Sequence, residues 1–509
     1  MLAACFESHV SPNPAAPTPP ALLSPSQIRA AIAAVMMTIL LAALDQTIVS
    51  VAVPTIARQL GGFEWMAWVI SGYLIAATVV TPLYGKLSDL IGRRSVISIA
   101  IAIFLVASVG CALAQTLPQL VAARVLQGAG GGGLIATAQS VVADVIPLRE
   151  RGRFQGYISI VWAVASMVGP VVGGVLTQYL SWPWIFWINL PVGLIALVLV
   201  RSALRSLPVR RGNVRIDVLG ALLLLAGLTA LLIPITRVGQ GAPWSDALNL
   251  VGWALALALL VVFVRQQRRH PEPIVPLALF ANRSVVACCA LLFVCFFAMI
   301  SMSVLVPLRL QLAAGFSTAD AALRLLPLTL AIPAGAFLGG RWMFRGGRTL
   351  PPQRLGVALV PLGLGVFGFV SAAGAPAIAA LVTTGVGIGL QLPTLLITAQ
   401  QSVRREQIGT VTALTAFFRQ LGGAIGVAVL SSAVLLLLRE HLPAGLHALD
   451  GEGLGALLDA ARSGGMAAAS TDTAFRVVMR LAALFAMVSL WFVNRLPDVR
   501  LHDASADRR

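Results

Sequence analysis

The chain has 509 residues, of which 58% are hydrophobic and only 11% are charged. About a quarter of the residues of a soluble domain are charged, so this composition excludes a soluble protein and predicts one that spans a membrane. The apolar residues form long unbroken runs, which favours helices and excludes a membrane β-barrel. The net charge of +17 comes from arginines in short gaps between these runs, where it orients helices, and we expect no nucleic acid as a partner.

Fourteen apolar runs are long enough to cross a bilayer, since a helix needs about 20 residues to do so. They lie at roughly 28–53, 66–84, 95–115, 118–143, 154–179, 184–204, 216–236, 247–265, 284–312, 320–343, 354–372, 376–399, 411–438 and 474–494. The segment 1–27 is rich in Pro and Ala without the basic start of a signal peptide, so we predict a disordered tail. A second tail follows at 496–509.

The seventh and eighth runs contain few polar residues and separate two blocks of six. We therefore predict an all-α integral membrane protein with six-helix bundles at 28–204 and 284–495, related by an axis along the membrane normal. Cytoplasmic links and two extra transmembrane helices occupy 205–283. The second bundle includes an acidic outer loop at 439–473, which is either a mobile linker or a contact for a periplasmic adaptor protein.

The segments between the runs alternate in charge, and nearly all of the arginines fall in one set. By the positive-inside rule, that set is cytoplasmic, and an even number of spans then places both termini in the cytoplasm. The chain uses Arg almost to the exclusion of Lys, which suggests a GC-rich bacterial source and hence the inner or cytoplasmic membrane of a bacterium.

Asp45 and Arg124 are charges inside apolar runs. Asp45 lies 17 residues into the first span and Arg124 six residues into the fourth, which runs the other way, so both fall in the outer third. A charge at the bilayer centre costs about 2.5–3.5 kcal/mol, so opposite charges at one depth are natural partners. A carboxylate holds its proton more tightly in apolar surroundings and less tightly beside a guanidinium. The pair is either a proton-coupling site or a static packing element.

The stretch GKLSDLIGRRSV, 85–96, lies between the second and third spans, at the predicted cytoplasmic mouth. Gly85 permits close helix approach and Gly92 permits a tight turn. Asp89 can pair with an Arg in one conformation and separate in another, whereas the charge rule alone explains only Arg93 and Arg94. We predict that these five residues gate the conformational change.

The stretch GGRWMFRGGRTL between the tenth and eleventh spans repeats this spacing, which indicates two internal repeats. The alignment places Gly85 on Gly339, Gly92 on Gly346, Arg94 on Arg348 and Asp89 on Met343.

The fifth span contains GPVVGG, in which Pro170 removes a backbone N–H and bends the helix. Gly169, Gly173 and Gly174 leave a smooth face that predicts a hinge and seal between the bundles, with ordinary small-residue packing as the alternative. We expect the run GAGGGG at 128–133 to serve packing.

The thirteenth span echoes the fifth in FFRQLGGAIGVAVL, 417–430. Its glycines Gly422, Gly423 and Gly426 fall where Gly169, Pro170 and Gly173 fall. Arg419 contacts a substrate, a carboxylate or only the cytoplasmic interface. Arg309 flanks an outer gap, and we expect it at the membrane interface.

We expect a substrate chamber between the bundles near mid-membrane. Its candidate residues are polar or aromatic: Gln46, Gln127, Gln139, Trp162, Asn189, Gln391 and Arg419. The scarcity of acidic residues favours bulky apolar or weakly cationic cargo.

No catalytic Ser-His-Asp set, HExxH motif or ATP-binding loop can be placed, and no cysteines have metal-ligand spacing. We therefore expect no enzyme, no bound metal and no cofactor, and an ion gradient as the energy source.

The sequence GKLSDLIGRR resembles the loop signature of the major facilitator superfamily. LDQTIVSVAVP (44–54), RVLQGAGGG (124–132) and GPVVGG (169–174) are similar to signatures of its fourteen-helix drug:proton antiporter branch, although Ser50 stands where Asn is more usual. The resemblance implies the major-facilitator fold, a role of Asp45 and Arg124 in proton coupling, and multidrug efflux that gives antibiotic resistance. Met343 departs from the second loop of the family, which is commonly degenerate.

These observations predict a proton-coupled antiporter that exports drugs or other amphiphilic small molecules by alternating access. The alternative is a proton-coupled transporter of one metabolite, such as an amino acid, a sugar or a siderophore. A sensor or scaffold is disfavoured because neither tail is long enough for a folded domain.

Overall fold

The computed structural model describes residues 25–62, 65–145, 151–205, 217–239, 242–404, 407–440 and 465–498. Every regular element in these ranges is a helix, which confirms the predicted all-α class. The predictions made for the tail before residue 25, for 441–464 of the acidic loop and for the tail after residue 498 lie outside these ranges.

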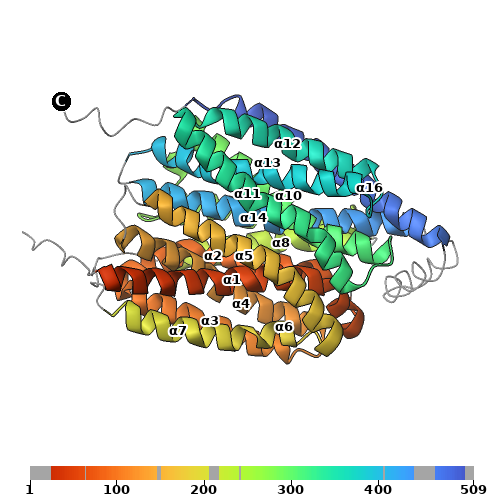
Figure 1. Cartoon of the computed structure of the whole chain (residues 1–509), viewed down its shortest axis with the longest axis horizontal. Coiled ribbons are helices and arrows are strands. Elements are labelled where there is room, and N and C mark those ends of the chain that lie inside the picture. Colours follow the sequence, from red (N-terminus) through yellow and green to blue (C-terminus); the bar gives the residue numbers. More distant parts are fainter. Residues whose placement is uncertain are drawn as a thin grey trace, which may run out of the picture.

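The first half of the chain supplies the helices of one side of the molecule (Figure 1). They are α1 (Pro25–Leu60), α2 (Met66–Ile91), α3 (Arg93–Ala112), α4 (Leu117–Val145), α5 (Arg151–Val175) with the π-helix η2 (Leu176–Leu180), α6 (Trp184–Trp187) and α7 (Asn189–Ala203). The break between α6 and α7 matters for the site, because it places Asn189 at the first turn of α7.

The second half supplies the helices of the other side. They are α10 (Arg283–Leu312), α11 (Thr318–Gly346), α12 (Leu350–Phe369), α13 (Ala375–Gln401), α14 (Ile408–Glu440) and α16 (Gly465–Val493), with the 3₁₀ turn η3 (Leu277–Ala281) before α10. Side-chain caps fix two of these helix starts. Asn282 accepts from the backbone N–H of Ser284, and Ser317 accepts from that of Asp320.

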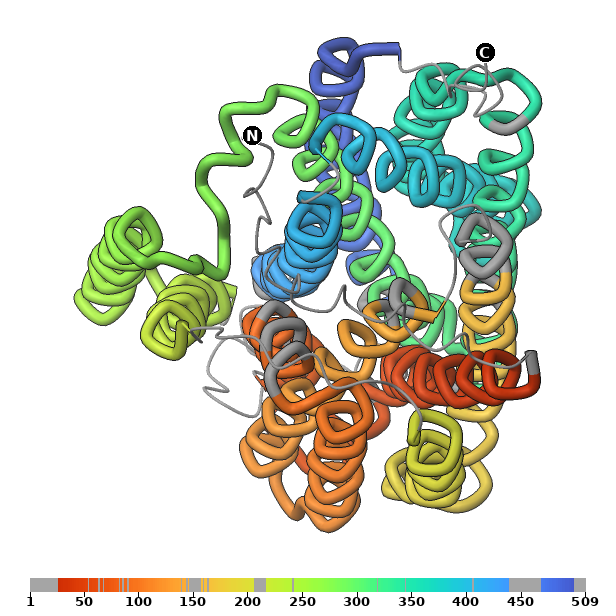
Figure 2. Tube along the Cα trace, turned by 90° about the vertical axis from the view of Figure 1, so that its left-hand side faces the viewer, coloured from red at the N-terminus to blue at the C-terminus, as the bar shows by residue number. Residues whose placement is uncertain are grey.

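The helices α8 (Val218–Gly239) and α9 (Ala247–Arg269) form a hairpin that stands outside the two halves (Figure 2). Trp68 of α2 donates to Thr236 of α8 at 3.3 Å. Gly239 at the end of α8 packs against Ser432 of α14. The hairpin is therefore attached to both halves through α8.

Each of the fourteen predicted spans corresponds to a helix, or to the α6–α7 pair, in the described part of the chain. Twelve of these helices are long and apolar enough to cross a membrane. The two that fall short are α2, whose apolar stretch is Trp68–Thr81, and α4. Twelve of the fourteen predicted spans are thus confirmed by length and composition. The helices α2 and α4 pack closely on each other.

The two halves meet where α5 packs on α11 and α2 packs on α14. Gly174 of α5 lies against Ala319 of α11, and Gly423 of α14 lies near Leu74 of α2. Small residues at both crossings let the backbones approach closely, as they do in membrane helix interfaces.

The turn between α2 and α3 consists of Gly92 alone, and α3 begins at Arg93, two residues before the predicted span. Gly92 has φ 89° and ψ 148°, a backbone conformation open essentially to glycine. In the second repeat, Gly347 rather than the aligned Gly346 is the turn residue, with φ 60° and ψ 14°. The spacing alone does not distinguish these two adjacent glycines, so the alignment of the repeats places the turn one residue early. We call the end of the molecule with these two turns the Arg-rich end.

Candidate functional site

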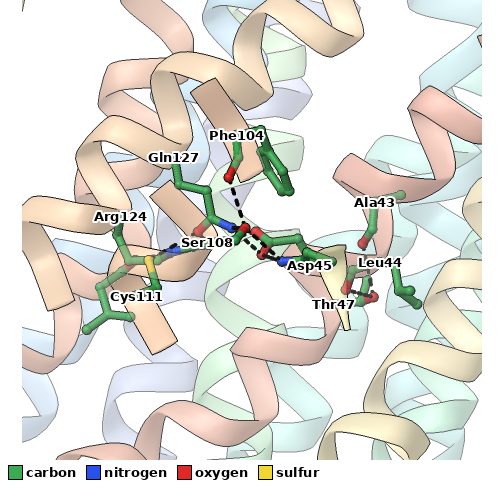
Figure 3. Close-up of polar contacts among 11 residues, drawn as sticks. Ala43, Leu44, Asp45, Thr47, Phe104, Ser108, Cys111, Arg124 and Gln127 are labelled. Carbon is green, nitrogen blue, oxygen red and sulfur yellow. Dashed lines mark hydrogen bonds and ion pairs between the residues drawn. The ribbon is translucent and has the colours of Figure 1, made fainter. Parts of the chain in front are cut away.

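Asp45 of α1 and Arg124 of α4 form an ion pair inside the first half of the molecule (Figure 3). The Nη1 atom of Arg124 donates to Oδ2 of Asp45 at 2.7 Å. Asp45 is 0% exposed and Arg124 is 1% exposed. The sequence predicted that these two charges lie together, and the structure confirms that they do.

The other oxygen of Asp45 is held by two amides. Gln127 of α4 and Asn189 of α7 each donate to Oδ1 at 2.9 Å. Gln127 also donates to Oγ of Ser108 at 2.7 Å, and Ser108 donates to the carbonyl of Phe104 in its own helix α3. The carboxylate thus ties α1 to α4 and α7 directly, and to α3 through Ser108.

The guanidinium of Arg124 has three further contacts. Its Nε donates to the carbonyl of Val69 at 3.2 Å, and Nη1 donates to Oε1 of Gln127 at 2.6 Å. It also lies over the ring of Tyr73, 4.2 Å from the ring centre, where a cation is attracted to the aromatic face. The charge is therefore compensated on every side, as a buried ion pair requires.

All donors to Asp45 are side chains, so the network can change without breaking a helix. Three donors occupy three of the about four lone-pair sites of the carboxylate, so a proton can bind at the site left on Oδ2 beside Arg124 or replace one of the donors. Loss of the carboxylate charge would in turn weaken its bond to Arg124, because the attraction between opposite charges is lost and only a hydrogen bond from the cation remains. The geometry is suited to coupling proton binding to helix movement.

The glycines of α5 pack on α1 directly beside Asp45. A Cβ at Gly169 would collide with the side chain of Thr47, and one at Gly173 would lie 2.9 Å from the carbonyl of Ile48. Thr47 donates to the carbonyl of Ala165 in α5 at 3.0 Å. On its other side, α5 contacts α11 at Gly174, so this one helix touches both the charged helix and the opposite half.

Pro170 lies inside α5 at this crossing. It has no N–H for the carbonyl of the preceding turn, which weakens the helix at the point where the halves meet. This placement is the geometry expected of the hinge and seal, although a role in gating stays a prediction.

The glycine run 128–133 provides packing surfaces, as predicted. A Cβ at Gly128 would collide with the backbone of Tyr73 in α2, and one at Gly130 would lie 2.7 Å from the backbone nitrogen of Phe104 in α3. A Cβ at Gly132 would collide with the backbone of Ala77. The run lets α4 pack tightly between α2 and α3 and so brings Arg124 to Asp45.

The structure places the predicted chamber residues in different environments. Gln127 and Asn189 are fully buried on Asp45, rather than facing an open chamber. Gln391 is also buried and donates to the carbonyl of Gly387 in its own helix. Gln46 and Trp162 are half-buried, and the side chain of Gln139 lies outside the described residues.

The residues of the predicted gate between α2 and α3 are described in part. Arg93 donates to the hydroxyl of Ser88, and Arg94 is exposed. Gly85 and Asp89 lie within the helical part of α2, but their contacts lie outside what the structure describes. The expected pairing of Asp89 therefore stays a prediction.

Arg309 was expected at the membrane interface, and its depth stays a prediction, but the side chain is enclosed by protein. Arg309 is fully buried, and its Nε donates to Asp472 of α16 at 2.8 Å. Nη1 and Nη2 donate to the carbonyls of Phe367 and Val370, each at 2.8 Å. The signal in the sequence was an Arg three residues before the end of a long apolar run. Such a residue has to find partners inside the protein.

Arg419 lies on α14, half-buried, with its guanidinium 5.4 Å from the ring centre of Phe296 in α10. Among the described residues, no group of three or more His, Cys, Asp or Glu side chains could hold a metal ion.

Residues 35–427 match the sequence profile of the Major Facilitator Superfamily. An uncharacterized MFS-type transporter of Mycobacterium tuberculosis is 35% identical over 428 residues, which cover 84% of this chain and 62% of that protein. The chain thus spans about three-fifths of the length of that relative. The multidrug transporter protein MdtP of Bacillus subtilis is 32% identical over 400 residues, covering 77% of this chain and 72% of MdtP. The efflux pump dotC of Dothistroma septosporum is 33% identical over 403 residues, covering 77% of this chain and 69% of that pump.

Solved structures with this fold include a bacterial homologue of the human lysosomal transporter Spinster. It superposes with a TM-score of 0.66 over 93% of this chain and 98% of the homologue, at 15% sequence identity.

Proposed function

The chain belongs to the major facilitator superfamily, and from this we propose that it is a proton-coupled antiporter that exports drugs or other amphiphilic small molecules. Relatives named as a multidrug transporter and as an efflux pump support export. The observation that carries proton coupling is the sealed network in which Arg124, Gln127 and Asn189 hold the carboxylate of Asp45.

The mechanism follows from where this network lies. Protonation of Asp45 removes the negative charge that holds Arg124, while its oxygens can still accept from the two amides, so α1 is less firmly tied to α4. Since Thr47 and Ile48 of α1 pack on the glycines of α5, a shift of α1 reaches the crossing of α5 with α11. Cargo binding and proton binding then favour different arrangements of the two halves, which is the requirement for exchange.

We propose an orientation in which the Arg-rich end faces the cytoplasm of a bacterium, with both termini on that side. The arginines of this end support it through the positive-inside rule. Protons then enter from the outside, down their gradient, as cargo leaves.

The test is transport by the purified protein in liposomes with an imposed pH gradient. A panel of unrelated amphiphilic dyes and single metabolites is offered to the wild type, to Asp45→Asn and to the control Asp472→Asn. We expect the wild type to move several dyes against their gradients. Asp45→Asn should lower gradient-driven transport by about 5–150-fold, the usual range of a coupling free energy, but keep exchange of labelled for unlabelled dye. Asp472→Asn should keep both activities.

Full gradient-driven transport by Asp45→Asn would remove this residue from proton coupling. Movement of a single metabolite with no dye transported would instead support the alternative of a dedicated metabolite transporter.

A further inference from the structure

Arg419 is half-buried within a membrane helix and differs in its partners from Arg124 and Arg309, which are fully buried. Arg124 and Arg309 each bind a carboxylate and at least one backbone carbonyl. Arg419 has no hydrogen bond or ion pair within the part of the chain that the structure describes. Its one specific contact there is with the ring of Phe296.

The surroundings of Arg419 are protein and largely apolar. Phe417 and Phe418 stand beside it on α14 with their rings 5.4 Å apart, and Phe418 contacts Phe280 of η3, the turn before α10. On α10, Cys295 and Phe296 approach the guanidinium, and no acidic side chain among the described residues acts on it. An aromatic face compensates a half-buried cation only in part, so part of the cost of this charge is left uncompensated.

Arg419 also lies inside the membrane core, on the side of the Arg-rich end. Arg124 contacts the backbone at Val69 of α2, and Leu74 of the same helix lies near Gly423 of α14. Five residues along α2 and four along α14, at a rise of about 1.5 Å each, place Arg419 roughly 14 Å nearer the Arg-rich end than Arg124. Arg124 lies six residues, or about 9 Å, inside a core about 30 Å thick, so Arg419 falls about 23 Å from the outer face, in the inner third of the core and beside the crossing of the two halves.

An arginine cannot relieve this cost by losing its proton, because the guanidinium stays protonated in proteins. Charges within membrane spans mark functional sites for this reason. We propose that Arg419 binds the carboxylate of the transported molecule, so that the cargo includes amphiphilic organic anions with an aromatic body. The guanidinium pairs with the carboxylate through two parallel hydrogen bonds, and the phenylalanines contact the ring system. This inference rests on the proposed transport function and departs from the weakly cationic cargo that the sequence favoured.

Two dyes with the same xanthene ring test the proposal. Fluorescein is an anion with a free carboxylate near neutral pH, whereas tetramethylrhodamine methyl ester is a cation without one. Uptake of each into liposomes is measured under a pH gradient, after subtraction of protein-free liposomes. We expect Arg419→Gln to raise the KM for fluorescein by about tenfold or more, since a hydrogen bond to a charged group is lost, and to leave the rhodamine ester within about threefold.

Arg419→Lys should fall between the wild type and Arg419→Gln, because Lys keeps the charge but not the paired geometry. Arg480→Gln is the matched control. Arg480 is likewise half-buried, and its guanidinium lies 5.0 Å from the ring centre of Phe369, but it stands on α16, away from the crossing of the halves. Both dyes should be transported by this variant as by the wild type.

The outcomes separate this inference from the proposed function. Transport of the rhodamine ester but not of fluorescein by the wild type would overturn the anion site and leave the antiporter intact. Equal loss of both dyes in folded Arg419→Gln would assign Arg419 to an internal partner in another conformation, and would also overturn it. If the wild type moves neither dye, these dyes give no support to the proposed antiporter. The anion site at Arg419 is then tested by measuring the affinity of the purified protein for fluorescein. Equal affinity of wild type and Arg419→Gln would then refute it.

Discussion

Each half of the molecule contains a buried ion pair, but the partners of the two pairs differ. In the first half, Asp45 is fully enclosed and all of its donors are side chains, contributed by α4 and α7. In the second half, Asp472 is 22% exposed and is shared between Arg309 and Arg476. Arg309 uses its other donors on the carbonyls of Phe367 and Val370, where α12 ends.

This difference indicates which pair can act as a switch. A cation at the end of a helix satisfies carbonyls that have no partner in the helix and complements its dipole, so Arg309 serves as a fixed cap. Side-chain donors can change rotamer while every helix stays intact, so the pair at Asp45 has a second arrangement within reach. Burial of an ion pair is therefore a weak guide to function, and the nature of its remaining partners is a better one.

The largest expected effect is on the free energy of unfolding of variants that remove one arginine from either ion pair. Arg124→Gln should lower it by about 3–5 kcal/mol, because Asp45 is left as a buried charge with no cation. Arg309→Gln should lower it by only about 1–3 kcal/mol, because Asp472 reaches water and keeps Arg476 while two carbonyls lose a donor. Denaturant unfolding of the detergent-purified variants measures both values.

Arg348→Gln is the control for these variants. Its ion pair with Asp498 is 50% exposed at the arginine and 35% at the aspartate, so removal should change the stability by less than about 1 kcal/mol. Equal losses for Arg124→Gln and Arg309→Gln would contradict the distinction between a switch and a cap.

The depth of a residue along its helix was predictable from the sequence, but the direction in which its side chain points was not. The fixed rise per residue of a helix is enough to put Asp45 and Arg124 at one level from their positions in the sequence alone. Gln127 was assigned to the chamber, although its position three residues after Arg124 puts it on the same helix face. The role of Asn189 depends on the break between α6 and α7, which the continuous apolar run concealed.

The ends of the spans were equally hard to define. Arg309 lies three residues before the end of α10, where an arginine at a membrane surface is common. What holds it inside is the end of α12 and Asp472, which are 58 to 163 residues away in the sequence. Contacts of such long range leave no local pattern in a single sequence, so the cap emerged only from the fold.

Glycines at equivalent positions offer a second test of the two halves. A Cβ at Gly173 would lie 2.9 Å from the carbonyl of Ile48, and one at Gly426 would lie 2.7 Å from that of Phe297. Alanine at either position should cost about 1–3 kcal/mol by overpacking. Only Gly173→Ala should also lower transport per folded molecule, because α5 touches both the helix of Asp45 and the opposite half. Thermal unfolding and dye transport on the same preparations separate these effects.

Gly340→Ala is the matched control, because no atom lies within 4 Å of a Cβ there. This variant should gain about 0.5–1 kcal/mol from its better helix propensity. A similar loss of transport in Gly426→Ala, at unchanged folded fraction, would mean that the second half moves internally as well.

The two turns at the Arg-rich end allow the same substitution to be compared in both repeats, with the smallest expected changes in stability. Gly347 has a left-handed conformation that Asn also adopts, so Gly347→Asn should change the stability by less than about 1 kcal/mol. Gly92 has ψ 148° at φ 89°, a region that Asn does not favour, so Gly92→Asn should cost about 1–3 kcal/mol. Thermal unfolding of the two variants measures both stability changes, which can be compared directly because the substitution is the same at both turns. Equal tolerance of Asn would mean that α3 can start without the strained turn, and that Gly92 is needed for movement and not for folding.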